Sequence, residues 1–434
     1  MNPRMILRAI DRHRSMLDLK GYEIFLEDMA REERVWRVTQ RDFARWWIRR
    51  EAAVVRFKLQ ADGVLVESDL SDACIQCEDG RVVSLPTVLP GEVIDERRPV
   101  IEVEPRFVDI ARRLCRHFGC GHIEIRAGAD RDPIGLSLTS VLEGFGRASR
   151  DAKRYPEDRL DAVRQALIEA SARAGFPWVC IWGLPAADGR PYRCAFSPRF
   201  DVDKAIVNMP RIAALQNRFD VVGTFYLRPV GLFYGAREIE RWRHSIPGNE
   251  LALHGEFVTT AETMQGTESE AARHEKQKLE RLLGEHVVGV CIHGGELRTN
   301  LSPRTAAAID EAGFEYETTS YDRPYTRPFY MPNEDATHWR TALTMIRQQD
   351  DVTVPLTSDF PTEMARRFRR DLDVAIEQGG VFVPTMHPLY FGVGNYLRYP
   401  ENVARLIGFV PVFLRRAMQM KSGNVYVNQE IRRG

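Results

Sequence analysis

Two carboxylates and three imidazoles in the C-terminal part of the chain follow apolar runs that are typical of buried strands. Asp201 and Asp203 stand shortly after "RCAFS", and His254 ends "ELALH". His293 follows "VVGVCI", and His387 follows "GVFVPTM". Oxygen and nitrogen ligands around an open coordination position are typical of a catalytic zinc or a similar divalent ion. These residues therefore form a candidate metal site.

A site of this kind suits hydrolysis. A divalent ion makes water acidic enough to attack a carbonyl near neutral pH. A carboxylate beside it can accept the proton, and a histidine across the site can protonate the leaving group. Each residue alone has an ordinary structural explanation, because a strand-end Asp often caps a turn and a lone His is more often a structural residue. The hypothesis depends on suitable residue types at four strand ends.

The strands and helices around these residues must bring them together. The predicted strands cover residues 178–182, 193–197, 221–227, 250–254, 287–292, 314–319, 351–356 and 380–386. Helix-like segments separate several of them. Because parallel strands need helical crossovers, this alternation predicts an α/β chain with a (β/α) barrel-like architecture. In such barrels, functional side chains lie at the carboxyl ends of the strands.

The clearest predicted helix is "SPRTAAAIDEAG". Ser302 can cap its first turn, Pro303 suits the first helical position, and Gly313 suits a left-handed C-terminal cap. Two further helices are predicted at "ESEAARHEKQKLERLLG", which Gly284 ends, and at "PTEMARRFRRDLDVAIEQGG".

Residues 1 to 175 have a different pattern. "TQRDFARWWIRREA" predicts a capped helix, in which Trp46 and Trp47 are expected to pack a core. The short runs after it, including "RRPVIEVEP", predict a small antiparallel unit with turns at "ADG" and "EDG". The predicted organisation is an N-terminal α+β accessory region over 1–105, a helical connector over 106–175 and a barrel over 176–434.

Composition narrows the class of protein. The 434 residues include 61 Lys and Arg and 61 Asp and Glu, so no overall positive field draws the chain to nucleic acid. Arginine-rich runs such as "RREAAVVR" are interpreted as solvated helix faces. No run approaches the roughly 18 apolar residues of a membrane span. Seven cysteines and an N-terminus without a signal-like apolar region predict a cytoplasmic protein with reduced thiols. The oligomeric state is not predicted.

Other motifs indicate no additional chemistry. The glycine-containing turns lack the spacing of phosphate-binding loops, and no G-x-S-x-G elbow of serine hydrolases is present. Cys74 and Cys77, with Cys115, Cys120 and His122 later in the chain, are candidate zinc ligands. However, positions three apart on a strand face opposite sides, so buried free thiols are favoured.

The segment "FSPRFDVDKAIVNMPRIAALQNRFDVVGTFYL" resembles the first motif region of the polysaccharide deacetylases, the carbohydrate esterase family four fold. That family has a distorted seven-stranded β/α barrel, with a Phe-Asp-Asp or Asp-x-Asp motif, a helix and a Thr-Phe-Phe strand. Asp203 precedes Thr224 by 21 residues, as in that pattern. "ELALHGEF" resembles the second motif, "SPRTAAAIDEAGFEYETTSY" the helix and strand after the third, and "GGVFVPTMHPLYFG" the last. The resemblance covers residues 176–434.

The resemblance implies a metal-dependent hydrolase that removes an acyl group from an N-acylated sugar or glycan precursor. Its substrate would be a small molecule or an oligosaccharide. Its cofactor would be a divalent metal, for which zinc is the first candidate. By this likeness, Asp203 and His254 hold the metal, Asp201 is the base and His387 is the acid.

Departures from the family pattern leave the third metal ligand open. Val258 stands where the second His of His-x-x-x-His is expected, and "IHGGE" replaces the Arg-x-Pro motif, whose Arg would orient the base. His293 is the first candidate for the missing imidazole, and Glu256 is the other. The Asp-Val-Asp spacing shifts the base by one residue, which a bulge can correct.

Substrate contacts are expected from Glu256 and from aromatic residues near the mouth, above all Tyr321 and Tyr390, whose rings can stack on sugars. Two other functions stay open. Val258 favours a catalytically inactive glycan-binding or assembly module on the same fold. An amidohydrolase acting on a non-sugar amide is the other alternative, because a fold does not fix a substrate.

Overall fold

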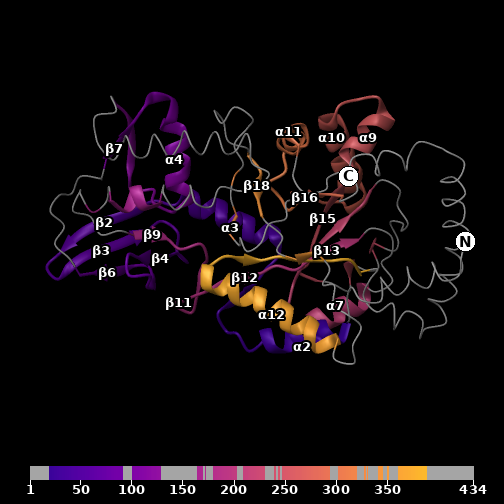
Figure 1. Cartoon of the computed structure of the whole chain (residues 1–434), viewed down its shortest axis with the longest axis horizontal. Helices are drawn as coiled ribbons and strands as arrows, with labels where there is room; N and C mark the ends of the chain where they lie inside the picture. The colour runs from indigo at the N-terminus through magenta and orange to yellow at the C-terminus, as the bar shows by residue number, and fades with distance from the viewer. Residues whose placement is uncertain are drawn as a thin grey trace, which may run out of the picture.

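The computed structural model describes residues 19–90, 100–128, 164–169, 172, 179–202, 209–229, 239–240, 243–244, 247–293, 302–319, 327–328, 330, 341–345, 349–350 and 360–388. In this part of the chain, a parallel sheet with covering helices lies beside a smaller region of short strands (Figure 1). None of the described helices is long and apolar enough to cross a membrane.

A curled parallel sheet forms the centre of the C-terminal part of the chain. Its strands lie in the order β18 (Leu343–Thr344), β17 (Tyr316–Glu317), β16 (Gly289–Ile292), β15 (Glu250–Gly255), β14 (Thr224–Leu227), β13 (Arg199–Val202), β21 (Pro384–Met386) and β19 (Gln349–Asp350). Every neighbouring pair is parallel. β13 to β16 are buried at every residue, as in sheets covered on both faces. The predicted α/β barrel-like fold is confirmed.

A second parallel sheet adjoins the first at the amino ends of two strands. It contains β1 (Val35–Arg37), β12 (Cys194–Phe196) and β20 (Val381–Phe382) in that order. β12 leads into β13 across two residues, and β20 leads into β21 across one residue. The two sheets are therefore parts of one curled layer, to which β1 adds a strand from early in the sequence.

Helices connect the parallel strands, as the alternating pattern predicts. They are α7 (Met209–Arg218), α9 (Phe257–Met264), α10 (Glu268–Leu283), α11 (Pro303–Glu311) and α12 (Phe360–Gln378). The Ser302 side chain accepts a hydrogen bond from the Thr305 N–H at the start of α11. Gly284 and Gly313, after α10 and α11, have φ angles of 68° and 70°. These caps confirm the predicted helix ends, because a left-handed residue suits glycine.

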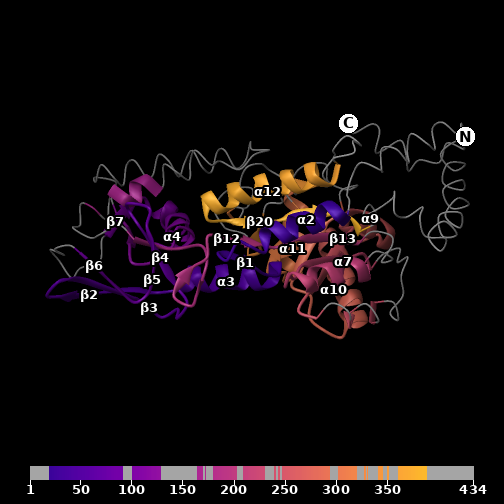
Figure 2. The ribbon, with the colours of Figure 1, turned by 90° about the horizontal axis from the view of Figure 1, so that it is seen from below.

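The helix α2 (Leu19–Met29) lies along α12 (Figure 2). Tyr22, Phe25, Leu26 and Met29 are buried at the spacing of one helical face. The ring of Phe25 lies 5.3 Å from that of Phe368 in α12. α2 is thus part of the core that supports the parallel sheet.

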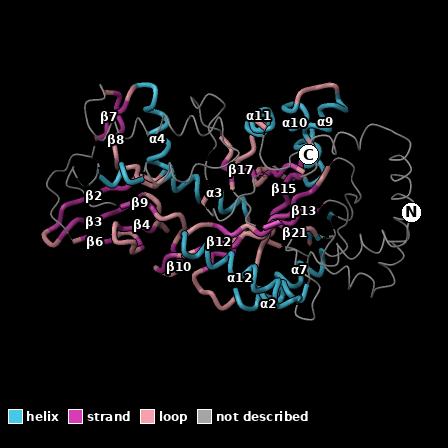
Figure 3. Tube along the Cα trace, viewed as in Figure 1, coloured by secondary structure: helices cyan, strands magenta, loops and turns pink. Residues whose placement is uncertain are grey.

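Short strands form a smaller region beside the barrel (Figure 3). The strand expected at 178–182 belongs to this region and not to the parallel sheet, because it pairs with a strand from early in the sequence. One antiparallel sheet contains β2 (Val55–Gln60), β3 (Gly63–Ser68) and β6 (Thr87–Leu89), and another contains β5 (Val82–Ser84), β4 (Cys74–Cys77) and β9 (Val179–Ile181). A third antiparallel pair is formed by β10 (Ala186–Ala187) and β11 (Arg190–Pro191).

The run "RRPVIEVEP" was expected in the antiparallel unit. Instead β7 (Val100–Val103) pairs in parallel with β8 (Glu124–Ala127), because η1 (Pro105–Phe107) and α4 (Val108–His117) form a crossover between them.

The helix α3 (Gln40–Ala52) joins the two regions. The Thr39 side chain accepts a hydrogen bond from the Asp42 N–H, as expected of a capped helix. Trp46 and Trp47 are buried, which confirms their predicted core role. The Trp46 Nε1–H donates to the Gly183 carbonyl at 3.1 Å and fixes α3 against the segment after β9.

The N-terminus of α3 meets the amino ends of the parallel strands at a buried carboxyl group. Glu250 Oε2 accepts hydrogen bonds from the Arg41 N–H and the Thr224 hydroxyl, both at 2.9 Å. Its Oε1 accepts from the Tyr316 hydroxyl at 2.8 Å. Burial outweighs these donors and raises the pKa of Glu250 to about 7.

This raised pKa predicts a pH-dependent stability. Between a pKa of 4.5 unfolded and about 7 folded, the native state binds more protons, so stability falls as pH rises through this window. The Glu250→Gln substitution removes this loss, because glutamine does not titrate. The unfolding free energy of the variant minus that of the wild type should therefore rise by about 3 kcal/mol from the low-pH to the high-pH end of the window. Urea unfolding at a series of pH values measures it. The exposed control Glu262→Gln should keep the pH trend of the wild type. A stability difference between Glu250→Gln and the wild type that stays constant with pH contradicts the prediction.

Candidate active site

A buried ion pair lies along β13, from Arg199 at its amino end to Asp201 near its carboxyl end. Arg199 and Asp201 are two residues apart, so their side chains lie on one face of the strand. Arg199 Nε and Nη2 each donate to one Asp201 carboxylate oxygen at 2.7 Å. The two side chains are only 1% and 3% exposed. Arg199 also donates to the carbonyl of Thr318, beyond β17.

Both partners of this pair are charged. Burial raises the pKa of Asp201, but the Arg199 guanidinium outweighs burial and holds the pKa well below its usual range. Burial lowers the pKa of Arg199, and the Asp201 carboxylate reverses this, so that its pKa lies above the usual value. A bidentate pair of this kind fixes the direction of both side chains.

His254 and Cys291 lie side by side on the neighbouring strands β15 and β16. They are directly opposite each other in the parallel register. His254 Nδ1 lies 3.0 Å from Cys291 Sγ. On the other side of the ring, His254 Nε2 lies 4.0 Å from Asp201 Oδ2, while Cys291 Sγ lies 3.9 Å from Asp201 Oδ1. Three strands therefore bring three different donor atoms to one buried centre.

His387 approaches the same carboxylate from β21. Phe200 and Met386 are partners in the register of β13 and β21, so the next residues, Asp201 and His387, lie beside each other. His387 Nε2 lies 3.9 Å from Asp201 Oδ2. The His387 side chain is 18% exposed, whereas that of His254 is 1% exposed. His387 thus lies on the side of the centre that is nearer to solvent.

A second polar cluster lies next to this centre. Arg228 and Glu256 form an ion pair, and His293 Nδ1 lies 3.4 Å from Glu256 Oε1. The rings of His254 and His293 meet edge to face, with their centroids 5.2 Å apart. The His293 side chain is 27% exposed. This cluster connects the buried centre with the surface.

The buried donor atoms match the needs of a divalent ion. Asp201, His254 and Cys291 each offer one ligand atom, and these atoms lie within 4.8 Å of one another. Oxygen, nitrogen and sulfur donors suit zinc and related transition ions. Each Asp201 oxygen accepts one hydrogen bond from Arg199, and a carboxylate oxygen has a second lone pair for a cation. The residues present therefore fit a metal.

The residues predicted from the sequence fall into three groups. Asp201, His254 and His387 surround the centre. His293 and Glu256 lie beside it and contact each other. The third group lies outside the described residues and comprises Asp203, Tyr321 and Tyr390. Within the part of the chain that the structure describes, the candidate cysteines Cys74, Cys77, Cys115 and Cys120 are buried and free and form no metal-binding group.

Sequence analysis did not single out Arg199 and Cys291. Arg199 brings a guanidinium to the Asp201 carboxylate from the same strand. Its signal was the two-residue spacing from Asp201, which places both side chains on one face. Cys291 precedes His293 by the same spacing, and its importance follows only from the register with His254.

Comparison with known proteins gives a structural likeness. No family model matches the sequence, and no curated protein matches it. A protein designated a polysaccharide deacetylase from Mycobacterium smegmatis is 20% identical, with a TM-score of 0.36, over 51% of this chain and 84% of its own. The polysaccharide deacetylase Bc1974 from Bacillus cereus is 13% identical, with a TM-score of 0.29, over 51% and 88%.

The catalytic domain of a peptidoglycan N-acetylglucosamine deacetylase from Eubacterium rectale is 12% identical, with a TM-score of 0.29, over 46% of this chain and 80% of its own. The parallel order of β13 to β18 defines the fold class of this chain independently of these scores. Over about half of its length, the chain is thus similar in structure to polysaccharide deacetylases, at low sequence identity.

Proposed function

We propose that this protein is a metal-dependent hydrolase that removes an acyl group from the nitrogen of an N-acylated sugar or glycan precursor. The observation that carries the proposal is the convergence of Asp201, His254, Cys291 and His387 on one centre at the carboxyl ends of parallel strands. Carboxyl ends of strands are where barrel enzymes place their reacting groups.

In this proposal, Asp201, His254 and Cys291 hold the ion. A bound divalent ion supplies a Lewis acid, which acidifies water and polarises a carbonyl. Because Arg199 holds the pKa of Asp201 low, this carboxylate is a weak proton acceptor, although the sequence pattern favoured it as the base. We therefore assign proton transfer to His387, which Asp201 orients from 3.9 Å.

The substrate would enter past the partly exposed cluster of Arg228, Glu256 and His293. Guanidinium, carboxylate and imidazole groups suit hydrogen bonds with sugar hydroxyls. If the protein is cytoplasmic, as its cysteine content favours, a soluble or lipid-linked precursor is a more accessible substrate than a finished wall polymer.

The assay is release of a carboxylic acid from a panel of N-acyl sugars by protein loaded with zinc, cobalt, nickel or manganese. His387→Gln should lower kcat by about 100-fold or more while metal content is unchanged, because proton transfer is lost and no ligand is removed. His286→Gln, at a side chain that is 97% exposed, is the matched control. Absence of acid release by the loaded wild type, or full activity of His387→Gln, argues against this function.

A catalytically inactive glycan-binding module is the second candidate. The observations that favour it are the bidentate engagement of Asp201 by Arg199 and the apolar Val258 at the position of a second imidazole. Metal content after purification without chelators separates the two functions. Stoichiometric metal favours the hydrolase, and absence of metal even after addition favours the module.

A further inference from the structure

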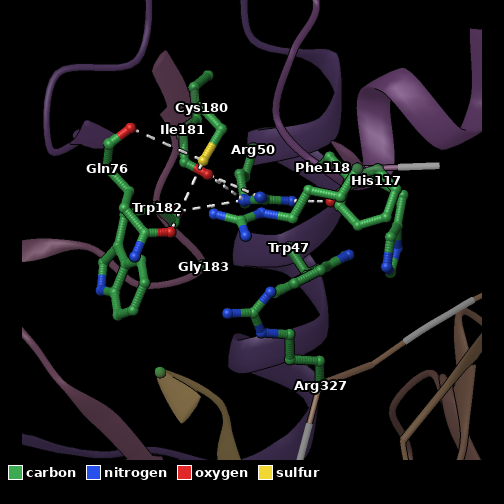
Figure 4. A pocket seen from close by; sticks show the side chains of 12 residues that line it. Trp47, Arg50, Gln76, His117, Phe118, Cys180, Ile181, Trp182, Gly183 and Arg327 are labelled. Carbon is green, nitrogen blue, oxygen red and sulfur yellow. Dashed lines mark hydrogen bonds between the residues drawn. The ribbon is translucent and has the colours of Figure 1, made fainter. Parts of the chain in front are cut away.

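A pocket with an excess of positive charge lies where the N-terminal region meets the barrel, and it shares no lining residue with the candidate active site. Arg50 from α3, Arg164 from the helical segment at 164–169 and Arg327 line it together with Trp47 and His117 (Figure 4). No Asp or Glu is present among the described residues that line it. Three guanidinium groups therefore share one pocket without a carboxylate in its wall.

Arg50 is the most buried of these cations, because it is only 4% exposed. Its hydrogen bonds go to backbone carbonyls: Nη1 donates to His117 at 2.7 Å, Nη2 to Ile181 at 2.7 Å, and Nε to Ile181 and Trp182 at 3.0 and 3.1 Å. Carbonyl groups satisfy N–H donors but carry no full negative charge. A buried charge without a counter-charge is costly.

Helix ends compensate only part of this charge. The carbonyl of His117 belongs to the last turn of α4, and that of Gln378, which accepts from Arg327 Nη2 at 2.9 Å, belongs to the end of α12. A helix C-terminus carries roughly half a negative charge. Two such ends supply roughly one negative charge against three guanidinium groups.

The carboxylate of Glu51 lies close behind the wall, next to His117. Its Oε1 accepts from Trp47 Nε1 at 2.8 Å and lies 3.8 Å from His117 Nδ1, and burial raises the pKa of this carboxyl group. His117 adds no charge of its own, because burial and the surrounding arginines lower its pKa to about 3. An excess of positive charge therefore remains inside the pocket.

We propose that this pocket binds a phosphate group. A guanidinium group can donate two parallel hydrogen bonds to two phosphate oxygens. A doubly charged phosphate would also balance the positive charge that the two helix C-termini do not compensate. The pocket is small and opens to solvent at its mouth, so it admits a phosphate group and leaves any substituent of that group outside. The anion would join α3, α4, the end of β9 and the end of α12, and thus the N-terminal region to the barrel.

The experiment is a calorimetric and thermal-shift titration of the full chain with inorganic phosphate, at an ionic strength held constant with chloride. Saturable binding and a rise in Tm are expected. Arg164→Gln and Arg327→Gln should each weaken binding by about tenfold or more, because each removes a charged donor. Arg116→Gln, at an exposed position next to His117 that does not line the pocket, is the matched control.

A parallel titration with glucose 6-phosphate distinguishes two sources of the phosphate group. Tighter binding of the ester than of inorganic phosphate identifies a phosphorylated metabolite, and equal or weaker binding identifies the free anion; both support the pocket. The Arg327 side chain also donates to the Gln378 carbonyl, so Arg164→Gln carries the test if Arg327→Gln fails to fold. Absence of saturable binding, or equal weakening in Arg116→Gln, overturns the proposal.

Discussion

The variant Arg199→Leu is expected to lose about 3 to 5 kcal/mol of unfolding free energy at neutral pH. The reason is the carboxylate that it leaves behind. Asp201 is 3% exposed, and both of its oxygens accept hydrogen bonds from Arg199. Without the guanidinium, a charged group stays buried with no equivalent partner, or it must take up a proton.

The loss should depend on pH in a defined direction. In the wild type, the lowered pKa of Asp201 means that its contribution to stability is fully present above the unfolded pKa. In Arg199→Leu, burial dominates and raises the pKa of Asp201, so the penalty grows as pH rises. The gap between the two proteins in urea unfolding should therefore widen from about pH 4 toward neutral pH.

Two controls define the outcome. The double variant Arg199→Leu/Asp201→Leu removes both charges and should recover much of the loss, since buried pairs exchange for apolar residues at low cost. Arg218→Leu breaks the surface pair with Glu23, where Arg218 is 62% exposed, and should cost less than about 1 kcal/mol. A loss in Arg199→Leu no larger than that of Arg218→Leu contradicts the prediction.

Local signals explain why so much of the barrel could be predicted from the sequence. Ser302, Pro303 and Gly313 act within one helix, and their preferences need no distant partner. Strand pairing is different, because it depends on tertiary contacts. The parallel pairing of β7 with β8 shows this, since the run itself is compatible with either direction. The predicted strand at 351–356 lies outside the described residues.

The same distinction between local signals and tertiary contacts applies to the candidate site. Strand ends could be located from the sequence, which is why Asp201, His254 and His387 were selected. The roles of Arg199 and Cys291 depend on strand register and on the face of the sheet that each side chain occupies. In addition, a cysteine in an apolar run cannot be distinguished from other small apolar residues by sequence alone. The run "RREAAVVR" was interpreted as a solvated face, yet Arg50 is buried. A single sequence does not show that distant carbonyls will surround an arginine.

Metal binding should depend on Cys291 and His254 far more than on His293. Cys291→Ser and His254→Gln are each expected to weaken the binding of zinc or cobalt by about 100-fold or more. Structural zinc binds with a free energy of roughly 10 to 16 kcal/mol, and one of three ligands accounts for a share of it. The expected loss of affinity follows from that share. His293→Gln should change the affinity by less than about tenfold, because His293 lies beside the centre and contacts Glu256.

Cobalt gives a readout that does not require activity. A thiolate ligand produces a near-ultraviolet charge-transfer band with Co²⁺, so the wild type and His293→Gln should show the band and Cys291→Ser should not. The geometry explains this contrast, since Cys291 Sγ lies 3.0 Å from His254 Nδ1 and 3.9 Å from Asp201. If Cys291→Ser binds metal like the wild type while His293→Gln does not, an imidazole is the third ligand, as the sequence alone predicted. Cys291 would then only fill space between the strands.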